Sequence, residues 1–511
     1  MELELEKRKI DCLTLVLDSC INHEEHTDYI VPDASPDVLK ILGAFGNAYI
    51  KEKAAREGKV TVSGVVEGWV LYVSEGDMAV RKIEVSIPFS QVFEGDGVTP
   101  DSKVMACAKL ASMEAREINP RKINVRADIA LCAQAYQPQS MEIAHDISDA
   151  KEYQIEKRCD VYQVSAPIAM QSKSFTVADD LEIPSGKPAF SSLLRHDVAL
   201  TTGETKIIGN KAVVKGAARI KCLYMTPENE IASLEGELPY SQIIDVDGMD
   251  ETCDLKVKME LRGAEITPQP DLSGDVTALM VSLPIEAYAI AHNQAEVESI
   301  QDAYSTRYPV DLRMGEKKVP QRAEHMNKRI AMTETITCEM PVKQILDLSI
   351  LLDPGRRYRE EGAEAWMNTV LISVLYIGED NTVSCAERKV TAICPMPESN
   401  GNSYRAEAMV QGENYNVGMG NEIIVRFYID YDIVGMSECA IPTAELIVVD
   451  TENTMDSAET PSVIVKYVTG NESLWELAKR YRTTMDEILA ANDLEEDEVR
   501  AGSMVLIPKK R

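Results

Sequence analysis

Hydrophobic and polar residues alternate over many short stretches of this chain. Residues 59–89 read KVTVSGVVEGWVLYVSEGDMAVRKIEVSIPF, in which runs rich in Val and Ile flank the polar break SEGD. Alternation with a period of two on both sides of such a break predicts a β-hairpin. Three other runs, KINVRADIALCAQ, DVTALMVSLPIEAYAI and NEIIVRFYIDYDIV, are also strand-like. The pattern therefore predicts a mainly β protein.

The hairpin pattern returns about 150 residues further along the chain. Residues 220–248 repeat the landmarks of residues 68–97 in the same order, and VPDASPDVLKIL (31–42) matches IPSGKPAFSSLL (183–194) with both prolines in register. Four matching boxes at one offset indicate an internal duplication. The matched landmarks are Gly64 with Gly216, Leu71-Tyr72 with Leu223-Tyr224, Pro88–Gln91 with Pro239–Gln242, and Asp96-Gly97 with Asp247-Gly248.

A third and weaker copy lies at residues 370–395. It keeps Leu375-Tyr376, the turn GEDNTVS and Pro395, but it lacks the aromatic-Ser-Gln box. We expect three related units, of which the third has diverged. Units of this length are large enough to fold alone, unlike solenoid repeats of about 20–50 residues. We expect three tandem β-sheet domains in series, presenting surfaces rather than one catalytic cleft.

Each unit is predicted to be a small β-sheet domain with a short helix after its Pro-x-x-x-Pro segment. The box IPFSQ (87–91) is either a ligand site or, as we favour, structural. In the structural interpretation the Pro ends a strand, the aromatic residue packs, and Ser-Gln caps a loop. The expected domains are a first unit with an N-terminal extension (1–150), a second (151–300), a third (301–445), an acidic linker (446–462) and a C-terminal module (463–511).

The C-terminal module has a predicted β-α-α-β order. VIVKYV and MVLIP are strand-like, and two Ser/Thr-x-x-Glu capping boxes, Ser473 with Glu476 and Thr484 with Glu487, mark the starts of two helices. Apolar residues at spacings of three and four predict one buried face on each helix. These faces comprise Leu474, Leu477, Ala478 and Tyr481 in the first helix, and Met485, Ile488 and Leu489 in the second.

This module resembles the LysM family. The signposts Tyr-Val-Thr, Gly, Ser-Leu-Trp-x-Leu-Ala, Ile-Leu-x-x-Asn and Leu-Ile-Pro follow in family order across residues 463–508, although Gly-Asn-Glu-Ser-Leu replaces a common Gly-Asp-Thr-Leu. The resemblance implies a groove that binds N-acetylglucosamine polymers, between the loop before the first helix and the loop after the second. By position, the groove residues are Thr469, Gly470, Asn471, Glu472, Ser473, Asn492, Asp493 and Leu494.

Trp475 follows Ser473 and Leu474 at the start of the first predicted helix. Leu474 and Leu477 are expected to point inward, which leaves Trp475 at the edge of the apolar face. One interpretation is that its indole covers the small core of the module. The other is that it anchors a partner, since Trp is enriched among the residues that dominate binding energy at interfaces. The two interpretations are compatible, and Trp475 is included among the candidate binding residues.

Three copies of this β unit followed by a LysM module resemble the SipL-type spore-coat morphogenetic proteins of clostridia. The landmarks are Pro36-Asp37 with Ile41-Leu42, Val62 to Gly64, Leu71-Tyr72 and Ile87 to Gln91. The resemblance implies a non-enzymatic scaffold in the mother cell that binds the coat's basement-layer morphogenetic ATPase and helps to localise coat around the forespore. It also implies that the LysM module serves protein contact. The alternative is a protein of the cell wall or cortex that binds peptidoglycan.

Composition narrows the choice of partners. The net charge of −31 argues against nucleic acid and anionic membrane surfaces, because binding to phosphate requires clustered Lys and Arg. The apolar runs are strand-sized, so no membrane insertion is expected. The N-terminal stretch lacks the features of a signal peptide. Eleven dispersed cysteines are expected to be buried thiols in a reducing compartment, which points to a cytoplasmic location.

The sequence carries few signs of catalytic chemistry. Phosphate-loop, nucleophile-elbow and dinucleotide-binding motifs do not occur in the sequence. CINHEEH (20–26) brings Cys20, His23 and His26 together, but it lacks the His-Glu-x-x-His spacing of zinc sites, so no metal site and no cofactor are expected. DAYSTRY (302–308) and YIDYDIV (428–434) combine Tyr with acidic residues, which exposed strand faces would explain.

Overall fold

The computed structural model describes residues 1–454, 462–468, 473–492 and 502–508, apart from residues 273, 361, 399–401 and 419. Within this part of the chain strands dominate, and both helices, α1 and α2, lie in the C-terminal module. The prediction of a mainly β protein with repeated sheet units before a β-α-α-β module is confirmed. The unit boundaries and the linker stay predictions; residues 455–461 of the linker lie outside the described residues.

Each unit follows one plan of strands. A long strand opens the unit, three strands form an antiparallel sheet, a further strand follows, and a second long strand pairs back with the first. In the first unit the two sheets are β3-β4-β5 and β2-β7-β6, and their inner faces enclose one core. The strands are β2 (Leu5–Ile30), β3 (Val38–Arg56), β4 (Lys59–Ser74), β5 (Val80–Glu94), β6 (Lys103–Asn119) and β7 (Lys122–Ile147).

The second and third units each split one strand of this plan. In the second unit β12 and β13 both pair with the closing strand, and in the third β16 and β17 both pair with β18. The third unit is therefore complete in structure although its sequence has diverged. The strands of the second unit are β8 (Ile155–Glu182), β9 (Ser192–Ile208), β10 (Lys211–Met225), β11 (Ile231–Asp245), β12 (Asp254–Leu261), β13 (Glu265–Pro270) and β14 (Val276–Ser305). Those of the third are β15 (Val310–Thr337), β16 (Val342–Leu352), β17 (Arg356–Glu360), β18 (Ala363–Gly378), β19 (Val383–Pro395), β20 (Ser403–Val417) and β21 (Glu422–Val449).

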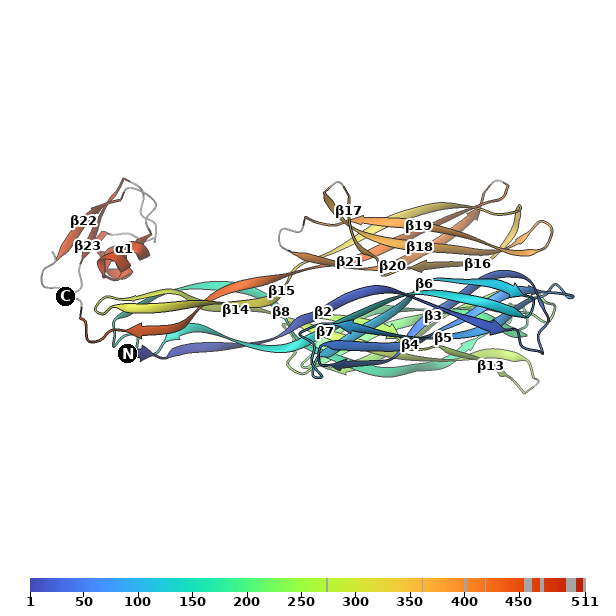
Figure 1. Ribbon diagram of the computed structural model, residues 1–511, viewed down its shortest axis with the longest axis horizontal. Helices are drawn as coiled ribbons and strands as arrows, with labels where there is room; N and C mark the ends of the chain where they lie inside the picture. The colour runs from blue at the N-terminus through green and yellow to red at the C-terminus, as the bar shows by residue number, and fades with distance from the viewer. Residues whose placement is uncertain are drawn as a thin grey trace.

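The long strands continue beyond the sheets as a stalk (Figure 1). The pairs β2–β7, β8–β14 and β15–β21 run antiparallel along it. At its tip the short strand β1 (Glu2–Leu3) pairs with the end of β21. Apolar side chains from all three pairs fill the interior of the stalk. One such cluster comprises Cys12, Met141, Ile143, Val164, Ala166, Val297, Val319 and Ile441.

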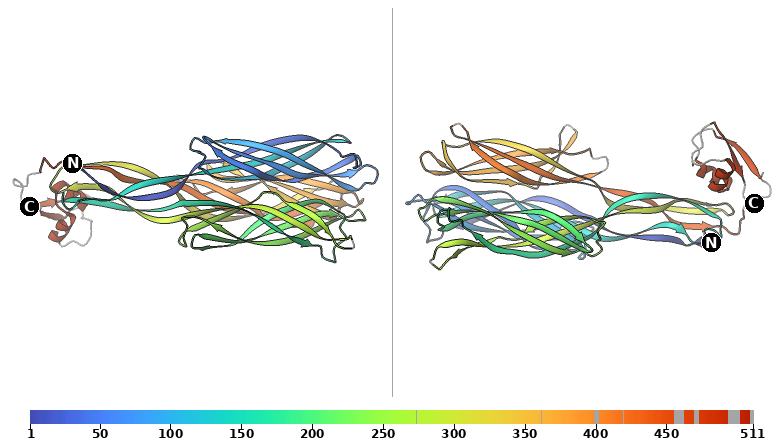
Figure 2. Two further views of the ribbon diagram at one scale, coloured as in Figure 1. Left: turned by 90° about the horizontal axis from the view of Figure 1, so that it is seen from below. Right: turned by 180° about the vertical axis from the view of Figure 1, so that it is seen from behind.

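The sheets of the three units lie side by side at the other end of the stalk (Figure 2). The three units follow one another along the chain as expected, but their sheet regions are not arranged end to end in space (Figure 2). The long strands of every unit join one stalk, which holds the three sheet regions next to one another. Leu71, Leu223 and Leu375, the Leu of each Leu-Tyr landmark, meet in a core that the units share. All three side chains are at most 2% exposed.

A buried arginine connects the three units. Arg195 of β9 is 1% exposed, and its guanidinium lies 4.2 Å from the ring centroid of Phe45 in the first unit. The same guanidinium forms an ion pair of 2.5 Å with Asp347 in the third unit and one of 2.8 Å with Asp197 in its own strand. Lys221 also pairs with Asp347, at 2.6 Å. Residues from all three units thus meet at one guanidinium.

The repeated glycine and the repeated aromatic residue form a cross-strand pair. Gly64 lies opposite Phe89, and Gly216 lies opposite Tyr240. A Cβ atom on Gly64 would lie 2.1 Å from the carbonyl oxygen of Tyr49 and 2.5 Å from the Phe89 ring, so only glycine fits beneath the aromatic ring. In the third unit the equivalent pair is Asn368 opposite Ala392. The third unit therefore lacks both the aromatic residue and the glycine of this pair.

The structural interpretation of IPFSQ is correct for Phe89 but wrong for its neighbours. Phe89 is buried, yet Pro88 to Gln91 all lie inside β5, so the Pro does not end the strand and Ser-Gln caps no loop. Pro88 is opposite Val65. The third copy has Thr391 at the corresponding register position, opposite Thr369, whereas Pro395 pairs further along with Ala365. Pro395 is therefore not the equivalent of Pro88.

The helix expected after each Pro-x-x-x-Pro segment does not form. Residues 38–56 are strand β3, and β9 occupies the same position in the second unit. The pairing of β3 with β4 is shifted at three places, between Val38 and Lys40, Ile41 and Gly43, and Ile50 and Glu52. Each bulge inserts an extra residue and breaks the alternation of period two. The irregular spacing of apolar residues in β3 has this cause.

Candidate functional site

The C-terminal module at the tip of the stalk has the predicted β-α-α-β order. β22 (Val463–Tyr467) and β23 (Met504–Pro508) form an antiparallel pair, and α1 (Leu474–Tyr481) and α2 (Met485–Asn492) pack against it. The predicted apolar faces are confirmed. Leu474, Leu477, Ala478 and Ile488 are fully buried, and Tyr481, Met485 and Leu489 pack around them.

Both helices begin at the predicted caps. The hydroxyl of Ser473 accepts a hydrogen bond of 3.2 Å from the backbone N–H of Glu476. At α2 the exchange is reciprocal, because the Thr484 hydroxyl accepts from the N–H of Glu487 while the Glu487 carboxylate accepts from the N–H of Thr484. These bonds satisfy donors that a helix leaves without partners at its start. Ser473, one of the candidate groove residues, therefore has a structural task.

Asn492 also serves the fold of the module. Its amide nitrogen donates to the carbonyl oxygens of Ile488, at 2.7 Å, and Leu506, at 2.6 Å, while its amide oxygen accepts from the N–H of Leu506 at 2.7 Å. The side chain thus connects the end of α2 to β23. The other groove residues, Thr469, Gly470, Asn471, Glu472, Asp493 and Leu494, lie outside the described residues.

Trp475 packs against the stalk rather than covering the module alone. Its indole is 6% exposed and meets the ring of Tyr304, in β14, edge to face with the centroids 5.0 Å apart. The indole N–H donates to the carboxylate of Asp302 at 2.8 Å. Lys479, one helical turn after Trp475, donates to both oxygens of the same carboxylate at 2.6 and 2.7 Å. The residue expected at the edge of the apolar face is thus an anchor for the module on its own stalk.

Tyr304 completes this contact. It is 5% exposed, and its hydroxyl donates to the carbonyl oxygen of Thr483, between the two helices, at 2.7 Å. Burial is the main cause that raises the pKa of Tyr304 above its ordinary value. The expectation that DAYSTRY and YIDYDIV form exposed strand faces is therefore wrong for Tyr304 and also for Tyr431, which is 1% exposed. An acidic residue and a Tyr two positions apart in a strand lie on the same face. This spacing in the sequence could have predicted that Asp302 and Tyr304 contact one partner.

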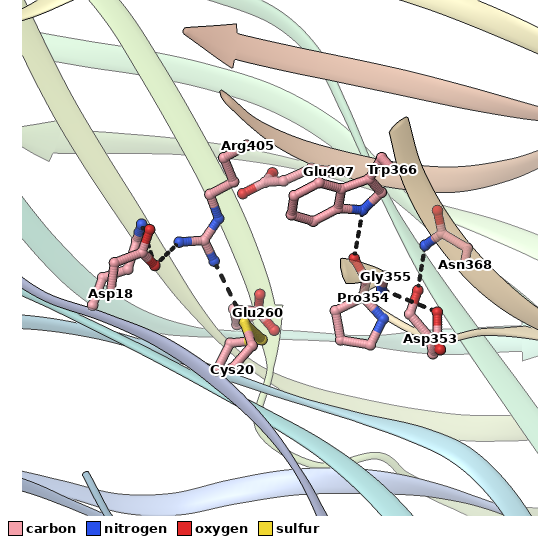
Figure 3. Close-up of a disulfide and its surroundings, with 12 residues drawn as sticks. Asp18, Cys20, Glu260, Asp353, Pro354, Gly355, Trp366, Asn368, Arg405 and Glu407 are labelled. Carbon is pink, nitrogen blue, oxygen red and sulfur yellow. Dashed lines mark hydrogen bonds and ion pairs between the residues drawn. A yellow bond between two sulfur atoms is a disulfide. The ribbon is translucent and has the colours of Figure 1, made fainter. Parts of the chain in front are cut away.

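Two of the cysteines expected as thiols form a disulfide. Cys20 lies directly opposite Cys132 in the pairing of β2 with β7, with the Cα atoms 4.1 Å apart (Figure 3). A register between strands 112 residues apart cannot be read from the sequence. The neighbouring His23 instead bonds to Glu25 at 2.8 Å. Across the described residues no group of three or more His, Cys, Asp or Glu side chains could hold a metal ion.

Models of known protein families match two of the repeated units and the C-terminal module. The family model of the SipL SPOCS domain matches residues 37–118 and 191–268, and that of the LysM domain matches residues 467–508. The chain therefore contains two SPOCS regions of the SipL type and a C-terminal LysM domain. The two SPOCS matches begin at the start of β3 and just before β9 and include the glycine opposite an aromatic residue in each unit. The long strands that close each unit, β7 and β14, lie outside the matched ranges.

No curated protein and no solved structure matches the chain. The SPOCS domain identifies a SipL-like protein of sporulation, associated with the spore coat, and both matched domains are binding or structural domains. The LysM domain adds a link to glycan recognition. In the described residues, no helix is both long and apolar enough to span a membrane.

Proposed function

We propose that this SipL-like protein is a non-enzymatic scaffold of spore-coat assembly that works in the mother cell. It binds the coat's basement-layer morphogenetic ATPase and helps to localise coat at the forespore surface. The observation that carries the proposal is the presence of SPOCS domains and a LysM domain on one chain. The structure supports it, because the repeated landmarks are buried packing residues such as Leu71, Tyr72 and Phe89 rather than a set of reactive groups.

The LysM module is the proposed contact for the ATPase. Its groove would use the stretch 469–473 and the residues from Asn492 to Leu494, with Trp475 beside it. Trp475 is engaged by Asp302 and Tyr304 in this structure. A partner that uses the indole must therefore compete with the stalk. Release of the module from the stalk would then strengthen binding of the partner.

Variants of the full-length chain separate these roles. Trp475→Glu changes the indole itself, whereas Asp302→Ala removes the acceptor on the stalk and leaves every LysM residue intact. Binding of each purified variant to the coat ATPase is measured by biolayer interferometry. We expect Trp475→Glu to weaken binding at least about tenfold, as for a central Trp at an interface. Asp302→Ala should leave binding unchanged or tighter.

Lys317→Ala is the control for a charge change on the stalk away from the module. If Trp475→Glu binds the ATPase as the natural chain does, the indole does not contact it. If no variant, nor the natural chain, binds, the proposed partner is wrong. Equal weakening by Trp475→Glu and Asp302→Ala would show that the docked module is the binding form.

A second candidate function is binding to N-acetylglucosamine polymers, which the LysM match favours. Co-sedimentation of the full-length chain with peptidoglycan sacculi tests it. Pelleting with sacculi together with a lack of ATPase binding would support a role at the wall or cortex in place of the scaffold role. The tie that Asn492 makes between α2 and β23 is intramolecular, so Asn492 adds no support to glycan binding.

A further inference from the structure

A large cleft opens between the three units, away from the LysM module. Its volume is about 1680 Å³, and its walls come from β2, β6 and β7 of the first unit, β9 and β12 of the second, and β15, β17, β18, β20 and β21 of the third. Sites for small molecules usually measure about 300–1,000 Å³. The cleft is therefore large enough for a segment of another protein. Neither matched domain accounts for it, because it forms only where the three units meet.

Free edges of strands border this cleft. Within the described residues, β12 pairs only with β14, and β20 pairs only with β21. Consecutive residues of both strands, Val257 to Leu261 and Ser403 to Met409, line the cleft. Side chains of a strand alternate between two faces, so consecutive residues border one cavity when the edge of the strand faces it. Such an edge presents backbone N–H and C=O groups that can pair with an extended chain.

The charge of the cleft differs from that of the whole protein. Its lining includes seven basic and seven acidic residues, whereas the chain has 53 Lys and Arg against 84 Asp and Glu. Each of the seven acidic residues forms an ion pair or accepts a hydrogen bond from the protein itself. Asp18 pairs with Arg405, Glu260 and Glu407 pair with Lys258, and Asp430 pairs with Arg329. Asp432 pairs with Lys256, Glu438 lies 3.8 Å from Lys318, and Asp353 accepts from the N–H groups of Gly355 and Thr369.

Four of the basic residues lack a carboxylate partner among the described residues: Lys109, Lys328, Arg356 and Arg357. Arg357 donates to the backbone of Tyr404, and Lys328 donates to the carbonyl oxygen of Pro395 at 2.6 Å. Arg356 and Arg357 are exposed. The lining as a whole is therefore balanced in charge, and these four side chains are the cations in it that have no carboxylate within ion-pair distance among the described residues.

An aromatic side chain lies beside these cations. Trp366 of β18 lines the cleft, and Arg357 lies opposite it in the pairing of β17 with β18. Its indole N–H donates to the carbonyl oxygen of Pro354 at 3.1 Å, which fixes the ring as Figure 3 shows. Arg405, in β20 of the same unit, pairs across the cleft with Asp18 of the first unit beside the disulfide (Figure 3). The site is thus built from fixed side chains.

We propose that this cleft binds an acidic segment of a partner protein, which adds as an extended strand to the edge of β12 or β20. Arg356, Arg357, Lys328 and Lys109 would pair with its carboxylates. The strand edges favour a peptide over a compact ligand, and the unmatched cations favour acidic residues. The inference is independent of the proposed ATPase contact, because no described residue of the LysM module lines the cleft.

A labelled octapeptide of alternating Glu and Val is the probe, and fluorescence anisotropy with the full-length chain is the readout. We expect saturable binding. The Arg356→Ser/Arg357→Ser variant should bind at least about tenfold more weakly, as for the loss of charge-assisted hydrogen bonds. The control Lys317→Ser/Lys389→Ser removes as much charge from positions outside the cleft and should bind as the natural chain does. Circular dichroism checks that each variant folds.

Two further probes separate strand addition from simple attraction of charge. The same peptide with N-methyl groups on alternate residues cannot donate its backbone hydrogen bonds and should bind at least about tenfold more weakly. The Lys–Val peptide should not bind. If Arg357→Ser disturbs folding through its bond to Tyr404, Arg356→Ser/Lys109→Ser replaces that variant.

Three results would overturn the proposal. The first is equal affinity of the natural chain and the variants in the cleft. The second is equal affinity for the N-methylated and the unmodified peptide. The third is a stable dimer in sedimentation velocity that excludes the probe, since a second copy of the chain would then occupy the cleft.

Discussion

Arg195 provides the sharpest test of how the three units are held together. Its guanidinium is 1% exposed and joins Phe45 of the first unit to Asp347 of the third. Substitution Arg195→Met keeps much of the length and apolar stem of the side chain but removes the charge. Asp347, itself 4% exposed, would retain only Lys221 as an ion-pair partner. A buried charge left without any partner costs about 3–5 kcal/mol, and because Lys221 remains beside Asp347 we expect a cost at the lower end of this range.

The double variant Arg195→Met/Asp347→Leu removes both buried charges. Replacing a whole buried ion pair by apolar residues of similar size is often close to neutral. We therefore expect the double variant to regain most of the loss, with a coupling energy of about 2–3 kcal/mol between the two positions. Urea unfolding followed by circular dichroism gives the difference in free energy of unfolding for each variant.

Two results would refute the role of the Arg195 charge. A cost below about 1 kcal/mol for Arg195→Met would show that water reaches the ion pair, as in exposed pairs. A double variant as unstable as the single one would show that Arg195 acts through packing on Phe45 and not through its charge. Hydrogen exchange in β9 and β16 measures whether the unit interface loosens locally before the chain unfolds.

Three further predictions concern glycine packing, protonation and the docked module. Gly64→Ala should destabilise the chain by more than about 2 kcal/mol in urea unfolding, since the new Cβ would meet the backbone of Tyr49, while Gly186→Ala, with open space around it, should be neutral. Burial, with smaller effects of Lys82 and Arg195, lowers the pKa of His196 to about 4. In the unfolded chain the imidazole takes up its proton at a higher pH, about 6.5, so acid favours the unfolded state. The free energy of unfolding should therefore fall by about 3 kcal/mol between pH 6.5 and pH 4. His196→Phe should remove this share of the pH dependence, and an unchanged pH profile would exclude His196 as its source. Asp302→Ala should raise the rate of hydrogen exchange at Trp475 and Tyr304 at least about tenfold. Each 1.4 kcal/mol or so lost from docking shifts the equilibrium between the docked and the released module by about that factor. Unchanged protection would show that the Asp302 carboxylate does not hold the module on the stalk.

Local patterns predicted local structure well. The hairpin of β4 and β5, the caps at Ser473 and Thr484, and the apolar faces of both helices follow from residues close together in the sequence. The repeat also showed that a third unit exists. What it could not show is that Gly64 and Phe89 form one pair, which explains why both are replaced at Asn368 and Ala392. That relation needs the register between strands.

Contacts between segments that are distant in the sequence could not be predicted. The expected helix near residue 40 failed because three bulges disturb the alternation in β3. The disulfide between Cys20 and Cys132, the ion pair between Arg195 and Asp347, and the bond from Trp475 to Asp302 each join residues more than a hundred positions apart. Each depends on which strands lie together in the stalk or at the centre of the units. No local spacing carries that information.

The localisation of a fluorescently tagged chain in sporulating cells tests the proposed scaffold role most directly. Cells with the coat morphogenetic ATPase are compared with cells that lack it, and the Trp475→Glu chain is imaged beside the natural one. The scaffold account predicts a ring of fluorescence around the forespore that disperses through the mother cell when the ATPase is absent. A ring that persists without the ATPase, or fluorescence at the cell wall, would contradict it.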